Sequence, residues 1–367
     1  MPSKKTNNQS ALRVQEGIAQ PPQLNEELLK VPVKKKPLQE AGYYISGILD
    51  GNRTILSQAI TLVESALPAH QVVAQKIIEG CMTHSGNSVR VGITGVPGVG
   101  KSTFIEAFGM HVIDRGHKVA VLAIDPSSQR SKGSILGDKT RMEELSVKNE
   151  AYIRPSPSAG SLGGVARKTR ETIVLCEAAG FGVIIIETVG VGQSETAVHS
   201  MTDFFLLLML AGAGDELQGI KRGIMEMADA LIINKADGDN ITKAQQASVQ
   251  YQNALHLFPP PPSGWAPRTG TCSALSGIGI AEVWDLVLEY LELTRSNGYF
   301  RQNRNSQAIS LMMESLNEQL FSSFFSNPDV EKEYQKIRES VGTNSYSPYS
   351  GALHLMQVYL KSVRQGD

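Results

Sequence analysis

The sequence predicts an α/β fold with a mostly parallel central sheet and helical extensions at both ends. Between Ser88 and about Thr294, short apolar stretches alternate with stretches of helical periodicity. Such alternation is typical of parallel sheets with helical crossovers. The longest apolar run, Phe204 to Gly212, is far below the roughly 20 residues that span a membrane, and it fits a buried central strand. At 367 residues, the chain exceeds one typical domain.

The first two segments precede this alternation. Residues 1–40 are polar, have Arg13 as their only arginine and carry several acids, which argues against a mitochondrial transit peptide. We expect a disordered extension there. Residues 41–87 are expected to form a helical segment, in which Pro68 separates two helices.

A phosphate-binding loop is predicted where the alternation begins. The stretch from Gly95 to Ser102 spells GxxxxGK[ST] between a predicted strand (Ser88–Thr94) and a predicted helix from Thr103. Glycines let consecutive N–H groups turn toward phosphate oxygens, and the helix dipole favours negative charge. We expect Lys101 to reach the β and γ phosphates and Ser102 to ligate Mg²⁺. The residues predicted to bind phosphate are Gly95, Val96, Pro97, Gly98, Val99, Gly100, Lys101, Ser102 and Thr103.

Carboxylates follow the next two predicted strands. Asp125 ends the strand Val119–Ile124 and is a second candidate ligand for Mg²⁺. Asp138 lies in a polar loop with the composition of a nucleotide-dependent switch, and it is either a metal ligand or a solvated loop charge. The strand Gly182–Ile186 ends in Glu187, where ordinary GTPases have aspartate. The predicted metal ligands are Ser102, Asp125, Asp138 and Glu187, and the predicted catalytic residues are Lys101, Glu187 and Gly190.

The predicted γ-phosphate sensor lacks the usual water-orienting glutamine. Gly190 is expected to turn its N–H toward the γ-phosphate, but Val191 stands where Ras-like enzymes have glutamine. Slow intrinsic hydrolysis is therefore expected, with Gln193, Glu195 or Asp215 as possible substitutes after a rearrangement.

A guanine-reading element follows a later strand. Leu231–Ile233 is followed by Asn-Lys-Ala-Asp, and the Asp237 carboxylate can accept from the ring N–H and the amine of guanine. Adenine has no such pair of donors, so it would leave a charge unpaired. A second loop after the strand Thr269–Thr271 would present its backbone to the guanine carbonyl. The predicted base-binding residues are Asn234, Lys235, Asp237, Ser273, Ala274 and Leu275.

Together, these elements predict a GTPase over residues 88–297, with Mg²⁺ as cofactor and GTP as substrate. One alternative is a P-loop kinase or ATPase linked to amino-acid transport, but it gains nothing from a guanine reader. A nickel-insertion GTPase is another, and it needs thiolate or imidazole ligands. The seven histidines show no ligand spacing with one another or with cysteine.

Composition limits partners and location. The net charge of −1 gives no global field to recruit nucleic acid or a membrane. Three scattered cysteines without CxxC spacing suit a reducing cytoplasm. Residues 298–367 are expected to be helical, and their apolar faces must be buried on the core or on a second subunit.

The motifs resemble those of the MeaB/ArgK family, which are SIMIBI-class P-loop GTPases associated with methylmalonyl-CoA mutase. The resemblance rests on DPSS, GSILGDKTRM, IRPSPS, ETVGVGQSE, GAGDELQGIKRGIME and NKAD, and it begins at about Gly51. Ala211 replaces the usual proline, and Ser131-Lys132-Gly133 replaces a more glycine-rich run. The resemblance implies a homodimeric GTPase, dimerised through residues 298–367. It also implies a chaperone of an adenosylcobalamin-dependent acyl-CoA mutase, gating cofactor loading and protecting the mutase. An older family label is a transport-system kinase.

Overall fold

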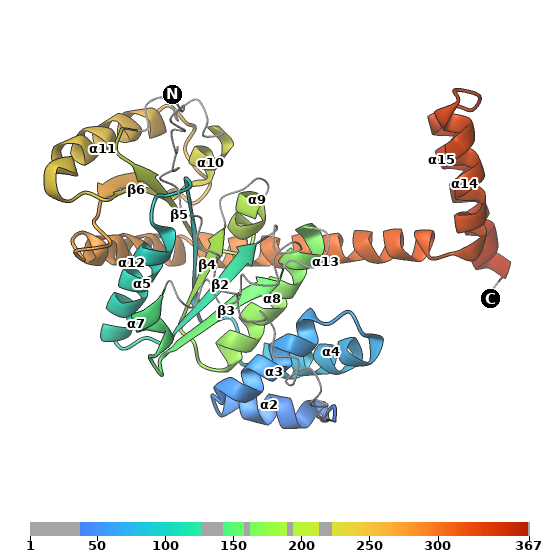
Figure 1. The fold of residues 1–367 in the computed structure, drawn as a ribbon, viewed down its shortest axis with the longest axis horizontal. Coiled ribbons are helices and arrows are strands. Elements are labelled where there is room, and N and C mark those ends of the chain that lie inside the picture. The colour runs from blue at the N-terminus through green and yellow to red at the C-terminus, as the bar shows by residue number, and fades with distance from the viewer. Residues whose placement is uncertain (1–36, 126–141, 158–161, 189–193, 213–221, 366–367) are drawn as a thin grey trace, which may run out of the picture. The chain divides into compact units, whose positions relative to one another are not determined.

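The computed structural model describes residues 37–125, 142–157, 162–188, 194–212 and 222–365, and residues 40–367 form one compact unit. Most of the predicted extension over residues 1–40 therefore lies outside the described residues. The centre is a seven-stranded sheet in the order β3-β2-β4-β1-β5-β6-β7 (Figure 1). All neighbouring strands are parallel, which confirms the predicted fold class. The strands are β1 (Val89–Gly95), β2 (Val119–Asp125), β3 (Ala151–Pro157), β4 (Val183–Thr188), β5 (Phe204–Leu210), β6 (Ala230–Asn234) and β7 (Arg268–Thr271).

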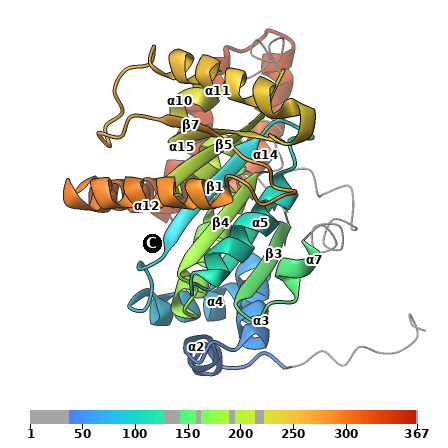
Figure 2. The same cartoon turned by 90° about the vertical axis from the view of Figure 1, so that its left-hand side faces the viewer.

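Helices cover both faces of this sheet. Apolar side chains alternate between the two faces, so that Leu206 and Leu208 of β5 enter one core while Leu207 and Met209 enter another. Helices α5 (Lys101–Asp114), α7 (Glu143–Ser146) and α12 (Ile280–Ser296) lie over the first face, and Figure 2 shows α5 and α12 in front of the strands. The opposite face carries α8 (Leu162–Ala178), α9 (Ser194–His199), α10 (Arg222–Met227) and α11 (Ile241–Leu255), the last entered through the short 3₁₀ helix η1 (Gly238–Asn240).

The N-terminal segment forms three helices, where the sequence pattern suggested two. They are α2 (Ala41–Leu49), α3 (Arg53–Glu64) and α4 (Pro68–Met82). Gly51 separates the first two because its φ of +72° is in the left-handed region. Asn52 then caps α3 by accepting from the N–H groups of Thr54 and Ile55. The three helices share a core with α8 and with side chains of β2 and β4.

The C-terminal segment is helical, as the sequence indicates. It consists of α13 (Tyr299–Phe325), α14 (Pro328–Gly342) and α15 (Pro348–Gln365), with Asn327 capping α14. Large apolar side chains remain exposed along α13 and α15, notably Phe321 at 68 % and Tyr349 at 75 %. Within the described ranges, no helix is both long and apolar enough to cross a bilayer.

A partly buried acid lies just ahead of β6. The carboxylate of Asp229 accepts a hydrogen bond from the backbone N–H of Phe205 at 2.8 Å. The backbone carbonyl oxygen of Asp229 accepts one from Trp265 Nε1 at 2.9 Å. Burial raises the pKa of Asp229 to about 7, and the nearby charge of Asp203 adds to this rise. The folded chain therefore holds a proton that the unfolded chain releases at about pH 4.

We predict that Asp229→Asn makes the protein more resistant to urea at pH 8 than the wild type is. Because the folded pKa is raised, the wild type loses stability as pH rises from about 4 to about 7, and the neutral amide does not. Urea midpoints at pH 5 and pH 8 check this. A difference between variant and wild type that stays the same at both pH values would contradict the assignment of a raised Asp229 pKa.

Candidate nucleotide-binding site

The phosphate loop lies between β1 and α5 at the carboxyl edge of the sheet, where ligands bind in parallel α/β folds. Two glycines are required by geometry. A Cβ on Gly95 would lie 2.5 Å from the carbonyl oxygen of Leu208, and Gly100 has a φ of +88° immediately before α5. The first N–H groups of α5 have no partner within the helix, so they are available to an anion. The predicted strand–loop–helix context is therefore present, with Ser102 and Thr103 in the first turn of α5.

Lys101 is folded back over this loop. Its Nζ donates to the carbonyl oxygen of Gly95 at 2.9 Å. Burial lowers the pKa of Lys101, while the negative charges of Glu187 and Glu195 act in the opposite direction. A bound phosphate would compete with the Gly95 carbonyl for the same ammonium group.

Glu187 lies at the same edge, on the strand next to β1. In the sheet register it is the partner of Ile93 on β1 and of Ala123 on β2, and its side chain is buried. The neighbouring Thr188 donates its hydroxyl to that of Thr94 at 2.8 Å, and both residues are buried. This bond ties β4 to the residue that precedes the phosphate loop.

The predicted metal ligands are only partly described. Ser102 and Glu187 approach the same edge from α5 and β4, and hydroxyl and carboxylate oxygens are the donors that Mg²⁺ prefers. Asp125 ends β2 beside β4, but its side chain lies outside the described structure. Asp138 and Gly190 lie outside the described residues altogether. In the part of the chain that is described, no group of three or more His, Cys, Asp or Glu side chains is arranged to hold a metal ion.

Asn234 connects the phosphate loop with the predicted base-reading loops. It ends β6 and is 1 % exposed. Its Nδ2 donates to the carbonyl oxygen of Val99 at 2.8 Å, and its Oδ1 accepts the N–H of Ala274 at 3.1 Å. The Cys272 thiol also lies 3.4 Å from Oδ1. One buried amide thus holds two loops that are far apart in sequence.

Four of the residues predicted to read the base are in hydrogen-bond contact, Ser273 with Asp237 and Asn234 with Ala274. The Ser273 hydroxyl donates to Asp237 at 2.5 Å and accepts the N–H of Ser276 at 3.2 Å. Lys235 has a φ of +58°, and its Cε is 3.9 Å from where a Cβ of Gly100 would lie, so it lies over the phosphate loop. By contrast, the side chain of Leu275 is 87 % exposed.

Three contacts of the site were not predicted from the sequence. They are the Thr94–Thr188 bond, the amide of Asn234 on Val99, and the contact of Cys272 with Asn234. Each joins residues on different strands or loops, and only the strand order and register place them together. No local pattern marks such pairs.

Comparison with known proteins agrees with this geometry. Residues 56–329 match the family model described as methylmalonyl Co-A mutase-associated GTPase MeaB. The GTPase ArgK of Escherichia coli is 46 % identical over 313 residues, which cover 85 % of this chain and 95 % of that protein. A Mus musculus protein, the mitochondrial methylmalonic aciduria type A homolog, is 43 % identical over 86 % of this chain and 78 % of its own length.

A solved structure is similar as well. The crystal structure of an LAO/AO transport system kinase superimposes with a TM-score of 0.71 at 39 % identity, covering 88 % of this chain and 99 % of that one. The family match covers far more than half of the chain and includes both the phosphate loop and the Asn-Lys-Ala-Asp loop. The chain belongs to the MeaB family of GTPases.

Proposed function

We propose that this GTPase binds Mg²⁺·GTP between the phosphate loop and the base-reading loop that Asn234 connects. It also acts, in this proposal, as a chaperone for an adenosylcobalamin-dependent acyl-CoA mutase of the methylmalonyl-CoA mutase type. The observation that carries the nucleotide assignment is the hydrogen bonding of Asn234 to both Val99 in the phosphate loop and Ala274 in the loop whose Ser273 contacts Asp237. A guanine base and its phosphates span just such a pair of loops.

In this proposal, the base is read by Asp237. Its carboxylate is aimed by the Ser273 hydroxyl, and it would accept two hydrogen bonds from the guanine edge. Leu275 would present its backbone N–H to the guanine carbonyl, since the N–H of Ala274 is already donated to Asn234. An adenine base would leave the carboxylate unpaired, which opposes binding.

The phosphates would be bound by backbone N–H groups of the loop, among them those of Gly98 and Gly100, and by Lys101. Ser102 and Glu187, with Asp125 and Asp138, would hold Mg²⁺, which neutralises charge on the phosphates when it is bound. Gly190 would sense the γ-phosphate. On GTP binding, Lys101 would exchange its hydrogen bond to the Gly95 carbonyl for one to a phosphate oxygen. Its ammonium group is then hydrogen-bonded both with and without nucleotide.

The partner assignment rests on the name of the matching family and on the name of one relative. The matching family is described as mutase-associated, and the mouse relative is named for methylmalonic aciduria. We propose that GTP binding and hydrolysis gate cofactor loading into such a mutase and protect it from inactivation. Three free and buried cysteines support the cytoplasm as its location.

A homodimer through residues 298–367 is part of the proposal. Apolar side chains on α13 and α15 stay exposed in the single chain, and a second copy would remove them from water. They are Ile309, Met312, Met313, Leu316, Leu320, Phe321, Leu353, Met356 and Leu360.

We predict that Asp237→Asn weakens GTP binding and admits xanthosine nucleotides. The amide can no longer accept from both donors of guanine, and each lost pair should cost on the order of 1–3 kcal/mol. Calorimetric titration with GTP, XTP and ATP measures this. Asp239→Asn, two residues on and exposed, is the matched control and should leave all three affinities unchanged. Equal GTP affinity in the Asp237 variant and the wild type would remove Asp237 from the site.

We also predict that a cognate mutase accelerates hydrolysis. Val191 replaces the usual glutamine, so the chain alone should turn over well below the roughly 1–10³ s⁻¹ of typical enzymes. Single-turnover GTP hydrolysis is measured with and without an adenosylcobalamin-dependent methylmalonyl-CoA mutase. A rate that is already fast alone, or that no such mutase changes, would favour an autonomous GTPase.

A further inference from the structure

Helix α9 begins directly after the segment that contains Gly190, and its first turn is buried. Ser194 is 0 % exposed and Glu195 is 5 % exposed. Among the described residues, Ser194 Oγ and Glu195 Oε2 have no hydrogen-bond partner. The charge of Glu195 also reaches Lys101, which places the turn within electrostatic range of the phosphate loop.

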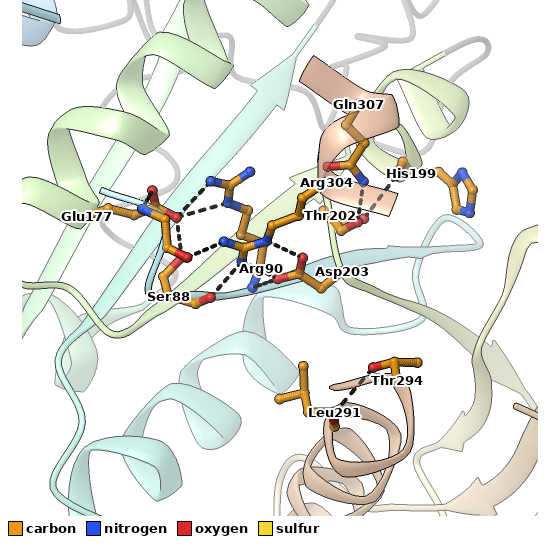
Figure 3. A network of polar contacts seen from close by, with 11 residues as sticks. Ser88, Arg90, Glu177, His199, Thr202, Asp203, Leu291, Thr294, Arg304 and Gln307 are labelled. Atoms are coloured by element: carbon orange, nitrogen blue, oxygen red, sulfur yellow. Dashed lines mark hydrogen bonds and ion pairs between the residues drawn. The ribbon is translucent and has the colours of Figure 1, made fainter. Parts of the chain in front are cut away.

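The residues that follow α9 are hydrogen-bonded to α13. Gln307 donates its Nε2 to the carbonyl oxygen of Thr202 at 2.8 Å (Figure 3). The Thr202 hydroxyl turns back to the carbonyl oxygen of Val198, in α9, at 3.1 Å. Two hydrogen bonds therefore connect α9 to Gln307 through Thr202.

Helix α8 also contacts the residues that follow α9. Arg170 is 8 % exposed, and its Nη2 donates to the carbonyl and hydroxyl oxygens of Ser200 at 2.9 and 2.7 Å. Its Nη1 lies 3.6 Å from Oε2 of Glu314 on α13, which is an ion pair but too long for a good hydrogen bond. Nε and Nη1 have no hydrogen-bond partner in the described structure. Arg170 thus bridges the end of α9 to α13 by charge.

The N-terminal part of α13 is bound to residues that flank the strands of the sheet. Arg304 forms a two-pronged pair with Asp203, at 2.8 and 2.7 Å, and donates to the carbonyl oxygens of Gly86 and Ser88 (Figure 3). Asp203 also accepts the backbone N–H of Arg90 at 2.8 Å. Paired guanidinium and carboxylate groups with this geometry are among the stronger polar contacts in proteins. This pair gives Gln307, three residues on, a fixed support.

The opposite face of α13 is the exposed apolar one. At 3.6 residues per turn, Arg304, Gln307 and Glu314 lie on one side of the helix. Ile309, Met313 and Leu316 lie on the other side, and all three are exposed. A protein bound to the apolar side therefore touches the same helix that holds the segment after α9.

We propose that Arg170 and Gln307 are positioning residues for GTP hydrolysis, which fix α9 and its buried Glu195 beside the phosphate loop by attaching them to α13. This inference rests on the proposed nucleotide site. It makes α13 the route by which contacts on the C-terminal helices change the hydrolysis rate. GTP binding, which depends on the loops around Asn234, does not need this attachment.

The test compares single-turnover hydrolysis with GTP affinity in the full chain. Gln307→Met keeps side-chain length and removes the donor, and Arg170→Met removes the guanidinium group while keeping an apolar stem. We expect each to slow hydrolysis by about five- to tenfold, as for the loss of about one hydrogen bond, with the Kd for GTP within about twofold. Arg170→Lys, which keeps one charged donor, should restore part of the rate. Gln319→Met is the matched control and should change neither quantity, because Gln319 is exposed on the same helix and, within the described ranges, donates only to Ser315.

The outcomes separate this inference from the proposed site. Unchanged hydrolysis in both methionine variants overturns the positioning role, and so does a proportional fall in hydrolysis, affinity and thermal stability, which would indicate a merely structural role. Lys101→Ala tests the site alone, and normal turnover in that variant would overturn the site. If Gln307→Met does not fold, Gln307→Glu replaces it, since a carboxylate of the same size cannot donate to the Thr202 carbonyl.

Discussion

The side-chain amide of Asn234 is the contact on which the site depends. Its donor and its acceptor are both used, one on Val99 in the phosphate loop and one on Ala274 in the second base-reading loop. Aspartate would lose the donor and alanine would lose both. Because the amide is fully buried, an unpaired partner on either loop would have no water to replace it. Asn234 is therefore a direct hydrogen-bonded link between the proposed phosphate-binding loop and the proposed base-reading loop.

The parallel sheet makes this arrangement possible. All seven strands end at the same edge, so loops that are distant in sequence meet there without any long-range sequence signal. The Thr94–Thr188 bond has the same character, since it joins neighbouring strands just before the phosphate loop and just after Glu187. Polar contacts at the other edge, between Arg304 and Asp203, anchor the C-terminal helices to the same strands. Events at the nucleotide edge and contacts on α13 thus share one rigid support.

Local patterns account for what could be predicted from the sequence. Glycines at Gly95 and Gly100 mark backbone conformations that other residues avoid, and apolar runs such as Phe204 to Gly212 mark buried strands. The phosphate loop, the Asn-Lys-Ala-Asp loop and the parallel fold class follow from these signals. The Arg304–Asp203 pair does not, because 101 residues separate its members and ordinary charged residues carry no mark of their partner. The burial of Glu195 could not be predicted from the sequence either, because its sequence neighbours are polar.

The central claim is that one amide couples the two loops, and hydrogen exchange of the nucleotide-free protein tests it directly. With Asn234→Ala, we expect faster backbone exchange in both residues 96–100 and residues 272–276, by about fivefold or more for the loss of about 1 kcal/mol in each loop. Asn240→Ala is the matched control, because Asn240 donates to the carbonyl of Lys235 in the same region but reaches neither loop. Faster exchange in both loops of the Asn234 variant alone is the predicted result. Unchanged exchange in either loop would show that the two halves of the site are held independently and would contradict the account.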